Sequence, residues 1–544
     1  MRRLVCIVLA IALAGVATGG CGSEPEEARS PLALVPQDAA ISAELIVRPE
    51  GAQRQAIEEL AAHFPGGERL GEELISSLDE SIAEETDVPG VEFTYEDDIE
   101  PWLGQRAAIF YLDFPSDPQG AYLLEATDED AADEALRKAA ETDRQREREK
   151  EYDGLEYLVD EDGTAGGVLD GFLVLGSEEG FQAVVDVSKG SRESVAATAE
   201  DPIATPGEDG VLAVARVDLN AIVKAVLTAP GQQAPTALPP GSGAQRALAA
   251  QPIADDAGEP AAGLGVLELA LFVESDRVRL DATAPMEGPG GTGGRQGDAA
   301  EGAAADILAG LPADAFAGAA LPRLGRTFAR GFRQGIKAQL GPVSDPRFFL
   351  QRLRQQIGFD PIDLFGALGD AGLFARSDEE QGLGGAAVIR VRDRLEVRKA
   401  LAGIRFVLER QPGIAVAELP PSLREAKGFS FAAPGVEQPV YLVLRRDRFA
   451  VALGGDAAAA AVGRGPSLES SPVLTETQDA LGPNFEPGLF VDFPPLLRAL
   501  ERSPTGDEPG FAEVARYLAA LHLAVVGAGS EGEDTLLRAV VTVD

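Results

Sequence analysis

Cysteine and histidine are scarce in this chain of 544 residues, which contains two of each. Two cysteines cannot build a disulfide framework, and two histidines cannot supply a histidine-rich metal site. Basic residues are also few, since 47 Lys and Arg stand against 89 Asp and Glu and give a formal charge of −42. Nucleic-acid binding needs clustered basic side chains that displace counterions from phosphate, so this charge argues against a nucleic-acid partner.

Common catalytic motifs are missing as well. The sequence has no Gly-x-Ser-x-Gly, no Gly-x-x-x-x-Gly-Lys and no His-Glu-x-x-His, the patterns typical of hydrolase nucleophiles, phosphate-binding loops and zinc peptidases. We therefore expect a protein that is not an enzyme, with no catalytic residue, cofactor or metal site. Hydrophobic residues make up 45% and charged residues 25%, a composition that indicates a globular chain, and its length indicates more than one domain.

Residues 1–20 have the layout of a secretory signal peptide. Met1-Arg2-Arg3 is a short basic segment, and Leu4–Ala17 is an almost unbroken apolar run. This run is shorter than the roughly 20 residues that a membrane-spanning helix needs. The pattern therefore predicts export followed by cleavage, rather than a membrane span.

The motif Thr18-Gly19-Gly20-Cys21 follows the apolar run and resembles the bacterial lipoprotein signal, or lipobox. Thr18 departs from that pattern, which prefers Leu at this position. The resemblance implies cleavage behind Gly20, a diacylglyceryl group on Cys21, and anchoring of the protein to the extracytoplasmic face of the cell membrane, because two acyl chains suffice for stable anchoring. Residues 21–33 would then be the lipidated cysteine and its tether. The alternative is ordinary signal-peptidase cleavage, which would leave Cys21 as a free thiol.

The acidity of the mature body bears on this anchoring. Loss of Arg2 and Arg3 with the signal peptide changes the formal charge from −42 to −44. Anionic headgroups repel such a body within about a Debye length, roughly 8 Å at physiological salt. The lipid anchor is therefore expected to overcome repulsion rather than to assist adsorption.

Five segments recur in the same order in two parts of the body, which is the pattern of an internal duplication. The first pair is Leu34–Ala40 and Gly310–Phe316. The others are a strand with a preceding turn, a hairpin with a short helix, a strand that runs into a helix, and a closing hairpin. We therefore predict an α+β fold of two tandem related halves, 34–285 and 305–544, joined by a Gly-rich linker at 286–304. Each half is expected to be a mostly antiparallel sheet covered on one face by helices.

Local patterns predict several elements within these halves. Apolar residues at three- and four-residue spacing predict helices at Arg326–Leu340 and Pro346–Ile357. Val168–Gly176 predicts a β-hairpin, because Asp170-Gly171 separates two apolar strands and Gly tolerates positive φ. The alternating charges of Glu129–Glu151 are typical of a solvated helix supported by i,i+4 ion pairs.

Some histidine, tryptophan and acidic residues could bind a ligand, but each also has a structural interpretation. His63 closes a predicted helix and His522 lies in an apolar strand, so we expect both to be structural. Trp102 could be a ligand platform, although a single aromatic residue at the start of a strand is more often a core anchor. Acidic clusters occur at 96–100, 128–134 and 160–163, of which the last holds only a fragment of a calcium-loop pattern that an ordinary turn explains.

Both halves open with Pro-x-Asp-Ala behind an apolar residue, and the first adds Pro101-Trp102-Leu103-Gly104 before a strand. Placed behind a lipobox, these motifs resemble an uncharacterised family of exported bacterial lipoproteins with a domain of unknown function, typical of high-GC Gram-positive bacteria. The resemblance implies no activity. Two hypotheses follow. The first is a membrane-anchored extracytoplasmic protein that binds an unknown ligand or envelope protein without catalysis. The second is a lipid or glycolipid carrier whose sheets and helices enclose an apolar cavity.

Overall fold

The computed structural model describes residues 29–85, 93–113, 118–142, 148–198, 204–207, 210–222, 265–285, 303–340, 346–378, 382–432, 435, 438–463, 465–531 and 534–544. They form two compact units. The described residues of the first unit lie within Met1–Pro230, Ala261–Gly291 and Glu531–Leu536. Those of the second unit lie within Thr292–Ser530 and Leu537–Asp544. The predicted signal peptide, Cys21 and the predicted linker up to residue 302 lie outside the described residues, so they stay predictions.

The described strands belong to one 20-stranded sheet, and its registered pairs are antiparallel. The α+β class is consistent with this sheet and its helices, but the prediction of two tandem related halves, each with its own sheet, is wrong. The recurring sequence segments indicate where strands and turns occur. They do not indicate where a sheet ends, because any edge strand offers free N–H and C=O groups to a further strand.

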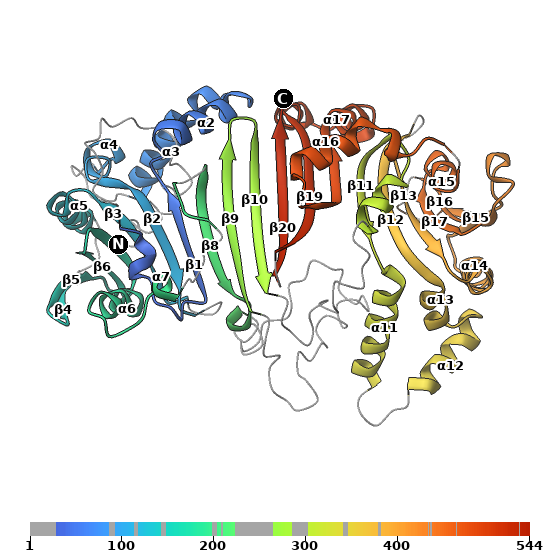
Figure 1. The fold of residues 1–544 in the computed structure, drawn as a ribbon, viewed down its shortest axis with the longest axis horizontal. Coiled ribbons are helices and arrows are strands. Elements are labelled where there is room, and N and C mark those ends of the chain that lie inside the picture. The colour runs from blue at the N-terminus through green and yellow to red at the C-terminus, as the bar shows by residue number, and fades with distance from the viewer. Residues whose placement is uncertain are drawn as a thin grey trace. The chain divides into compact units, whose positions relative to one another are not determined.

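Strands of the first unit pair in the order β4-β5-β6-β7-β3-β2-β1-β8-β9-β10 (Figure 1). The strands are β1 (Ile41–Ile46), β2 (Leu103–Tyr111), β3 (Gly120–Ala126), β4 (Arg148–Tyr152), β5 (Leu155–Val159), β6 (Thr164–Leu169), β7 (Phe172–Ser177), β8 (Val211–Asp218), β9 (Val266–Glu274) and β10 (Arg277–Pro285). The helices are η1 (Pro31–Leu34), α2 (Gly51–Ala62), η2 (Gly67–Arg69), α3 (Leu70–Glu85), α4 (Tyr95–Asp98), α5 (Glu129–Thr142), α6 (Glu178–Ser188) and α7 (Val195–Thr198).

Helices cover both faces of the sheet around β3 and β7. Leu173 packs in one core cluster with Leu136 of α5, whereas its neighbour Val174 packs in another cluster with Phe181 of α6. Successive side chains of a strand point to opposite faces, so α5 and α6 lie on different faces. The apolar run of β7 therefore reflects burial on both sides, and the expectation of helices on one face is wrong for this part of the sheet.

Strands of the second unit pair in the order β14-β15-β16-β17-β13-β12-β11-β18-β19-β20. The strands are β11 (Ala315–Leu321), β12 (Leu368–Asp378), β13 (Gly382–Val391), β14 (Ala415–Ala417), β15 (Lys427–Ala432), β16 (Val440–Arg445), β17 (Arg448–Leu453), β18 (Glu486–Asp492), β19 (Leu521–Glu531) and β20 (Asp534–Val543). The helices are α10 (Ala303–Ala309), α11 (Leu324–Leu340), α12 (Pro346–Ile357), α13 (Pro361–Ala367), α14 (Arg394–Leu408), η4 (Pro421–Leu423), α15 (Gly455–Val462), η5 (Leu468–Ser470), α16 (Pro472–Leu481), α17 (Phe493–Glu501), η6 (Pro504–Asp507) and α18 (Phe511–Leu518).

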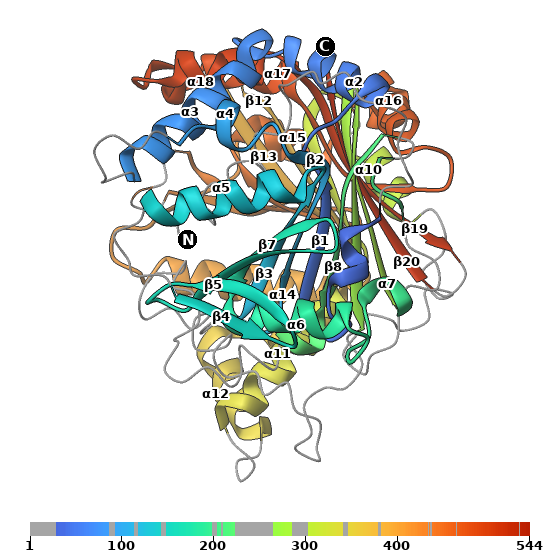
Figure 2. The same cartoon turned by 90° about the vertical axis from the view of Figure 1, so that its left-hand side faces the viewer.

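Helix α14 closes a core in the second unit. Val397 and Leu401 of this helix are buried in one cluster with Ile389 of β13 and Phe429 of β15. The side chain of Asp393 caps the helix by accepting a hydrogen bond from the N–H of Leu395 at 2.8 Å, as Asp commonly does at a helix start. Helices α11 and α12 instead extend past one end of the strands of this unit (Figures 1 and 2).

Several local predictions are confirmed. Helix α12 has the predicted bounds, and α11 begins two residues before its predicted start. The predicted hairpin forms from β6 and β7, with Leu169 paired to Phe172. Asp170 and Gly171 have φ values of 49° and 82°, the left-handed conformations that a two-residue turn of this type requires.

The predicted solvated helix at Glu129–Glu151 is wrong beyond Thr142. Helix α5 ends at that residue, and Arg148–Tyr152 forms β4, which pairs with β5. The missed signal is Asp153-Gly154, where both residues have positive φ and Tyr152 pairs with Leu155. A second Asp-Gly turn thus sets the local structure, and the charged residues Arg148–Glu151 lie on a hairpin instead of a helix.

Close packing of α6 on β3 makes Gly180 sensitive to substitution. A Cβ at this position would lie 2.2 Å from the carbonyl oxygen of Gly120, so Gly180→Ala must shift the helix or the strand. We expect a lower midpoint of thermal unfolding, from a cost of about 1–3 kcal/mol. The matched control is Gly335→Ala in α11, where a Cβ meets no atom within 4 Å and should be neutral or slightly stabilising. Equal midpoints for the two variants would contradict this packing.

Candidate functional site

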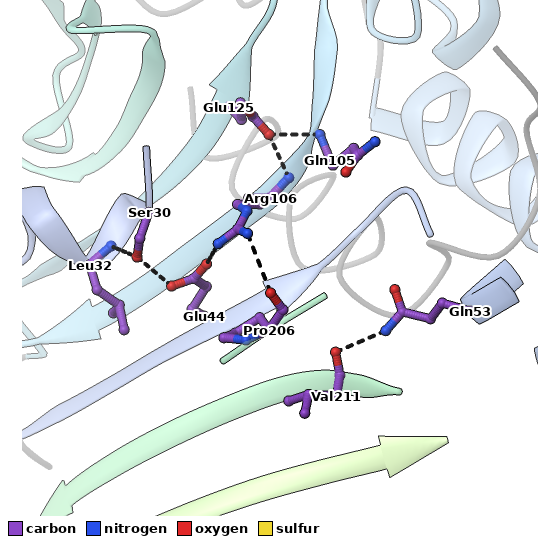
Figure 3. A network of polar contacts seen from close by, with 9 residues as sticks. All are labelled: Ser30, Leu32, Glu44, Gln53, Gln105, Arg106, Glu125, Pro206 and Val211. Carbon is purple, nitrogen blue, oxygen red and sulfur yellow. Dashed lines mark hydrogen bonds and ion pairs between the residues drawn. The ribbon is translucent and has the colours of Figure 1, made fainter. Parts of the chain in front are cut away.

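A buried carboxylate in the first unit is the first candidate for a chemical site (Figure 3). Glu44 on β1 is 1% exposed. Arg106 on β2 donates from Nη1 to Oε1 of Glu44 at 2.8 Å, and Ser30 donates from Oγ to Oε2 at 2.6 Å. Burial raises the pKa of Glu44, and the hydrogen bond from Ser30 and the charge of Arg106 oppose this shift without cancelling it.

The geometry around Glu44 indicates a structural role. Both carboxylate oxygens are already bonded, so neither faces an open space where a substrate could sit. Ser30 also caps η1 by accepting from the N–H of Leu32, and Leu34 and Val35 behind it are fully buried. The network therefore fastens the first described residues of the chain to the sheet.

Sequence reasoning did not single out Glu44 or Arg106. The available signal was the position of Glu44 in an alternating strand, where the burial pattern of β1 places it on the same face as Ile46. A carboxylate at an inward position of a strand needs a buried cationic or hydrogen-bonding partner. The partner Arg106 is 62 residues away in the chain, so the pair could not be read from spacing.

His522 on β19 lies in a small acidic cluster of the second unit. Its Nδ1 is 3.1 Å from Oδ2 of Asp544, and its Nε2 is 3.5 Å from Oε2 of Glu476. Burial raises the pKa of the nearby Asp492, which the charge of His522 partly offsets. Among the described residues no group of three His, Cys, Asp or Glu side chains is placed to hold a metal ion. We interpret the cluster as a set of ion pairs at the surface.

The other residues considered from the sequence have local structural roles. His63 is the C-cap of α2. Trp102 is 1% exposed and donates from Nε1 to the carbonyl oxygen of Asp98 at 2.7 Å, which confirms it as a core anchor. Asp160 forms the predicted turn, since its Oδ1 accepts from the N–H groups of Asp162 and Thr164.

The other acidic clusters also serve local structure. Asp98 pairs with Lys138 at 2.5 Å, and Asp97 donates its N–H to the capping hydroxyl of Thr94. Asp128 accepts from the N–H of Ala131 at the start of α5. These contacts are helix caps and an ion pair, so the sequence clusters do not converge on a common centre.

An open apolar groove of about 290 Å³ lies between α11 and α13 in the second unit. Phe365 of α13 forms its centre, with a ring centroid 5.7 Å from that of Phe328 and 5.5 Å from that of Phe332. The remaining lining residues are Leu324, Thr327 and Gly331. Three aromatic rings without a charged lining residue suit an apolar group, such as a hydrocarbon chain or an apolar side chain. We take this α11–α13 groove as the candidate binding site.

Sequence reasoning predicted the helix that carries the groove but not the groove. Leu324, Phe328 and Phe332 follow one another at four-residue spacing on one face of α11, a pattern that normally marks a core face. Phe328 is nevertheless 51% exposed, because α13 covers only part of the α11 face. Exposure of this face depends on tertiary packing and could not be read from periodicity.

Comparison with known families shows what the chain is related to. Residues 4–524 match the family described as "Protein of unknown function (DUF3352)". The chain belongs to this family. Membership confirms the predicted domain of unknown function, and the description of DUF3352 gives no activity.

Other comparisons add little to the family assignment. No curated protein matches this DUF3352 chain. A solved structure described as "Structure of crystal form I of TP0453" is similar over 48% of this chain and 81% of its own length, with 9% identity and a TM-score of 0.24. A TM-score this low carries no argument about fold or function. Within the described residues, no helix has the length and apolar composition needed to cross a membrane.

The raised pKa of Glu44 predicts a pH-dependent difference in stability between wild type and Glu44→Gln. Between the ordinary Glu value of 4.5 and the raised folded-state pKa, the folded state binds more protons than the unfolded state. Its stability therefore falls as pH rises through this window. The glutamine variant cannot titrate here, so wild type should lose stability relative to it as pH rises above about 4.5. Unfolding midpoints of both proteins over this pH range test the prediction. A constant difference, or one that favours wild type as pH rises, would contradict it.

Proposed function

We propose that this protein is a membrane-anchored extracytoplasmic lipoprotein that acts by binding an apolar group rather than by catalysis. The observation that carries the binding part is the α11–α13 groove, which is open to the surface and lined by Phe328, Phe332 and Phe365. The anchor is inferred from the signal-peptide layout of residues 1–20 and from Cys21 behind it. Export, lipidation and the absence of catalysis are all parts of the proposal.

The residues that follow the proposed anchor are held against the folded body, which supports this arrangement. The Ser30 hydroxyl is bonded to the buried Glu44, and Arg29 lies 3.7 Å from Asp170. Only the residues between Cys21 and Arg29 would then separate the acyl chains from the folded body. Eight or so extended residues reach about 30 Å at most, so such a tether would keep the body close to the membrane.

The size of the groove favours binding of a single apolar group over transport of a whole lipid. Pockets that enclose drug-sized ligands have volumes of about 300–1,000 Å³, and the groove of about 290 Å³ lies just below that range. It is also open along one side, between α11 and α13. An apolar side chain of an envelope protein, or part of one acyl chain, fits this space. The lipid or glycolipid carrier remains the second candidate.

Substitution of Cys21 tests the anchor. Wild type should remain in the membrane fraction after a wash in about 1 M salt, which shortens the Debye length to about 3 Å and removes electrostatic attachment. Cys21→Ser should leave the membrane fraction, because no acyl chains can be attached. Cys6→Ser is the matched control, since Cys6 lies in the apolar run that cleavage removes. Retention of Cys21→Ser in the washed membranes would show that Cys21 is not the anchor.

Substitution of Phe332 tests the groove, with a fluorescent fatty acid as the apolar probe. Phe332→Ser removes one ring that faces Phe365, and we expect probe affinity to fall about two- to tenfold from loss of one aromatic contact. The control is Phe406→Ser on α14, a 50% exposed phenylalanine outside the groove. Circular dichroism of both variants checks that helix content is retained. Equal affinities for wild type and Phe332→Ser would exclude the groove as the binding site.

A further inference from the structure

Helices α11 and α12 carry a local charge opposite to that of the whole chain. Helix α11 contains Arg326, Arg330, Arg333 and Lys337 and no acidic residue. Helix α12 contains Arg347, Arg352 and Arg354 and likewise no acidic residue. We call α11 and α12 the basic helix pair. Seven positive charges gathered on two helices of a chain with a formal charge of −42 form a distinct electrostatic region.

The described arginines of the basic helix pair are not neutralised by the protein. Arg326, Arg330 and Arg333 of α11 and Arg352 and Arg354 of α12 are all exposed. None of these five forms an ion pair with a carboxylate among the residues that the structure describes. Arg405 of α14, by contrast, forms ion pairs with both Glu409 and Glu418. The charge of the basic helix pair is therefore available to an external anionic surface.

Exposed aromatic side chains accompany these charges. Phe348 is 72% exposed and Phe349 is 39% exposed at the start of α12, and Phe328 on α11 is 51% exposed. Exposure of large aromatic side chains to water is unfavourable, so three on one helix pair indicate a surface that is covered in use. The basic helix pair extends past the strand ends of its unit (Figures 1 and 2).

Helical spacing separates the charges from the apolar residues on α11. Arg326, Arg330 and Arg333 are four and three residues apart and share one face, which Lys337 continues one turn later. The apolar residues Leu324, Phe328 and Phe332 are four residues apart and share another face. A helix with a basic face, an apolar aromatic face and no acidic residue is the pattern of a helix that lies in the membrane interface.

We propose that the basic helix pair docks on a bilayer surface that contains anionic phospholipid. Arginine side chains bind the phosphate-containing headgroups, and Phe348, Phe349 and Phe328 enter the boundary between headgroups and acyl chains. Charge complementarity selects this partner, because the remainder of the acidic chain is repelled by the same surface. This inference rests on one part of the proposed function, namely that the protein lies at a membrane. It does not depend on lipidation of Cys21.

The test uses the full chain with Cys6→Ser and Cys21→Ser, so that an introduced cysteine is its only thiol. Phe348→Cys is labelled with a polarity-sensitive fluorophore and mixed with vesicles of phosphatidylcholine alone or of phosphatidylcholine with phosphatidylglycerol. We expect the emission to shift to shorter wavelength with the anionic vesicles only, and the shift to be lost in about 1 M salt. The control label at Phe406→Cys, on a phenylalanine of α14 that is 50% exposed, should not respond.

Charge variants measure the electrostatic part in the same assay. Arg330→Gln with Arg333→Gln should weaken vesicle affinity about 20- to 30-fold, because each basic residue near an anionic surface contributes about fivefold. Arg394→Gln with Arg398→Gln removes the same charge from two exposed positions of α14 and should change the affinity little. The proposal would be overturned if the chain co-sedimented with vesicles while the emission of the label at position 348 stayed unchanged. An equal emission shift with both vesicle types would overturn it as well. So would binding of an acidic peptide by a chain that binds no vesicles.

Discussion

Electrostatic repulsion between an acidic body and an anionic membrane is the constraint on which this account depends. A chain with a formal charge of −42 cannot adsorb through its average surface charge, so attachment has to come from hydrophobic burial or from a local reversal of sign. Acyl chains on Cys21 would supply the first at about 0.8 kcal/mol per buried methylene. The basic helix pair supplies the second, since it is cationic and free of acidic residues. The two attachments act by different physical forces, so salt should weaken the electrostatic contact of the basic helix pair and leave the acyl anchor unchanged.

The parts of the fold that could be predicted are those set by local chemistry. The turn at Asp170-Gly171 needs two residues with positive φ, and the flanking apolar runs supply the strands, so the β6–β7 hairpin follows from a short window of sequence. The bounds of α12 follow from Pro346 at its first position and from apolar spacing up to Ile357. An isolated aromatic residue at the start of a strand is more often a core anchor than a ligand platform, and the indole N–H of Trp102 donates to the carbonyl oxygen of Asp98 four residues earlier.

The parts that could not be predicted depend on contacts between residues that are distant in the chain, or on local features that a whole-chain property such as net charge conceals. Recurring segments indicated strands but not the continuity of one sheet, because edge pairing has no local sequence signal. The alternating charges around Arg148 favour a helix by their spacing, but the turn at Asp153-Gly154 makes this segment a β-hairpin. Net charge concealed the basic helix pair, since seven positive residues are lost in a sum over 544. The ion pair between Glu44 and Arg106 joins two strands that are far apart in the chain.

The central claim is that a short tether joins acyl chains on residue 21 to a body that begins at the buried network of Ser30 and Glu44. The intact mass of the mature polypeptide, extracted from membranes in detergent, tests this claim most directly. We expect a chain that begins at Cys21 and carries a diacylglyceryl group. A mass that retains residues 1–20, or one that shows residue 21 unmodified, would contradict it.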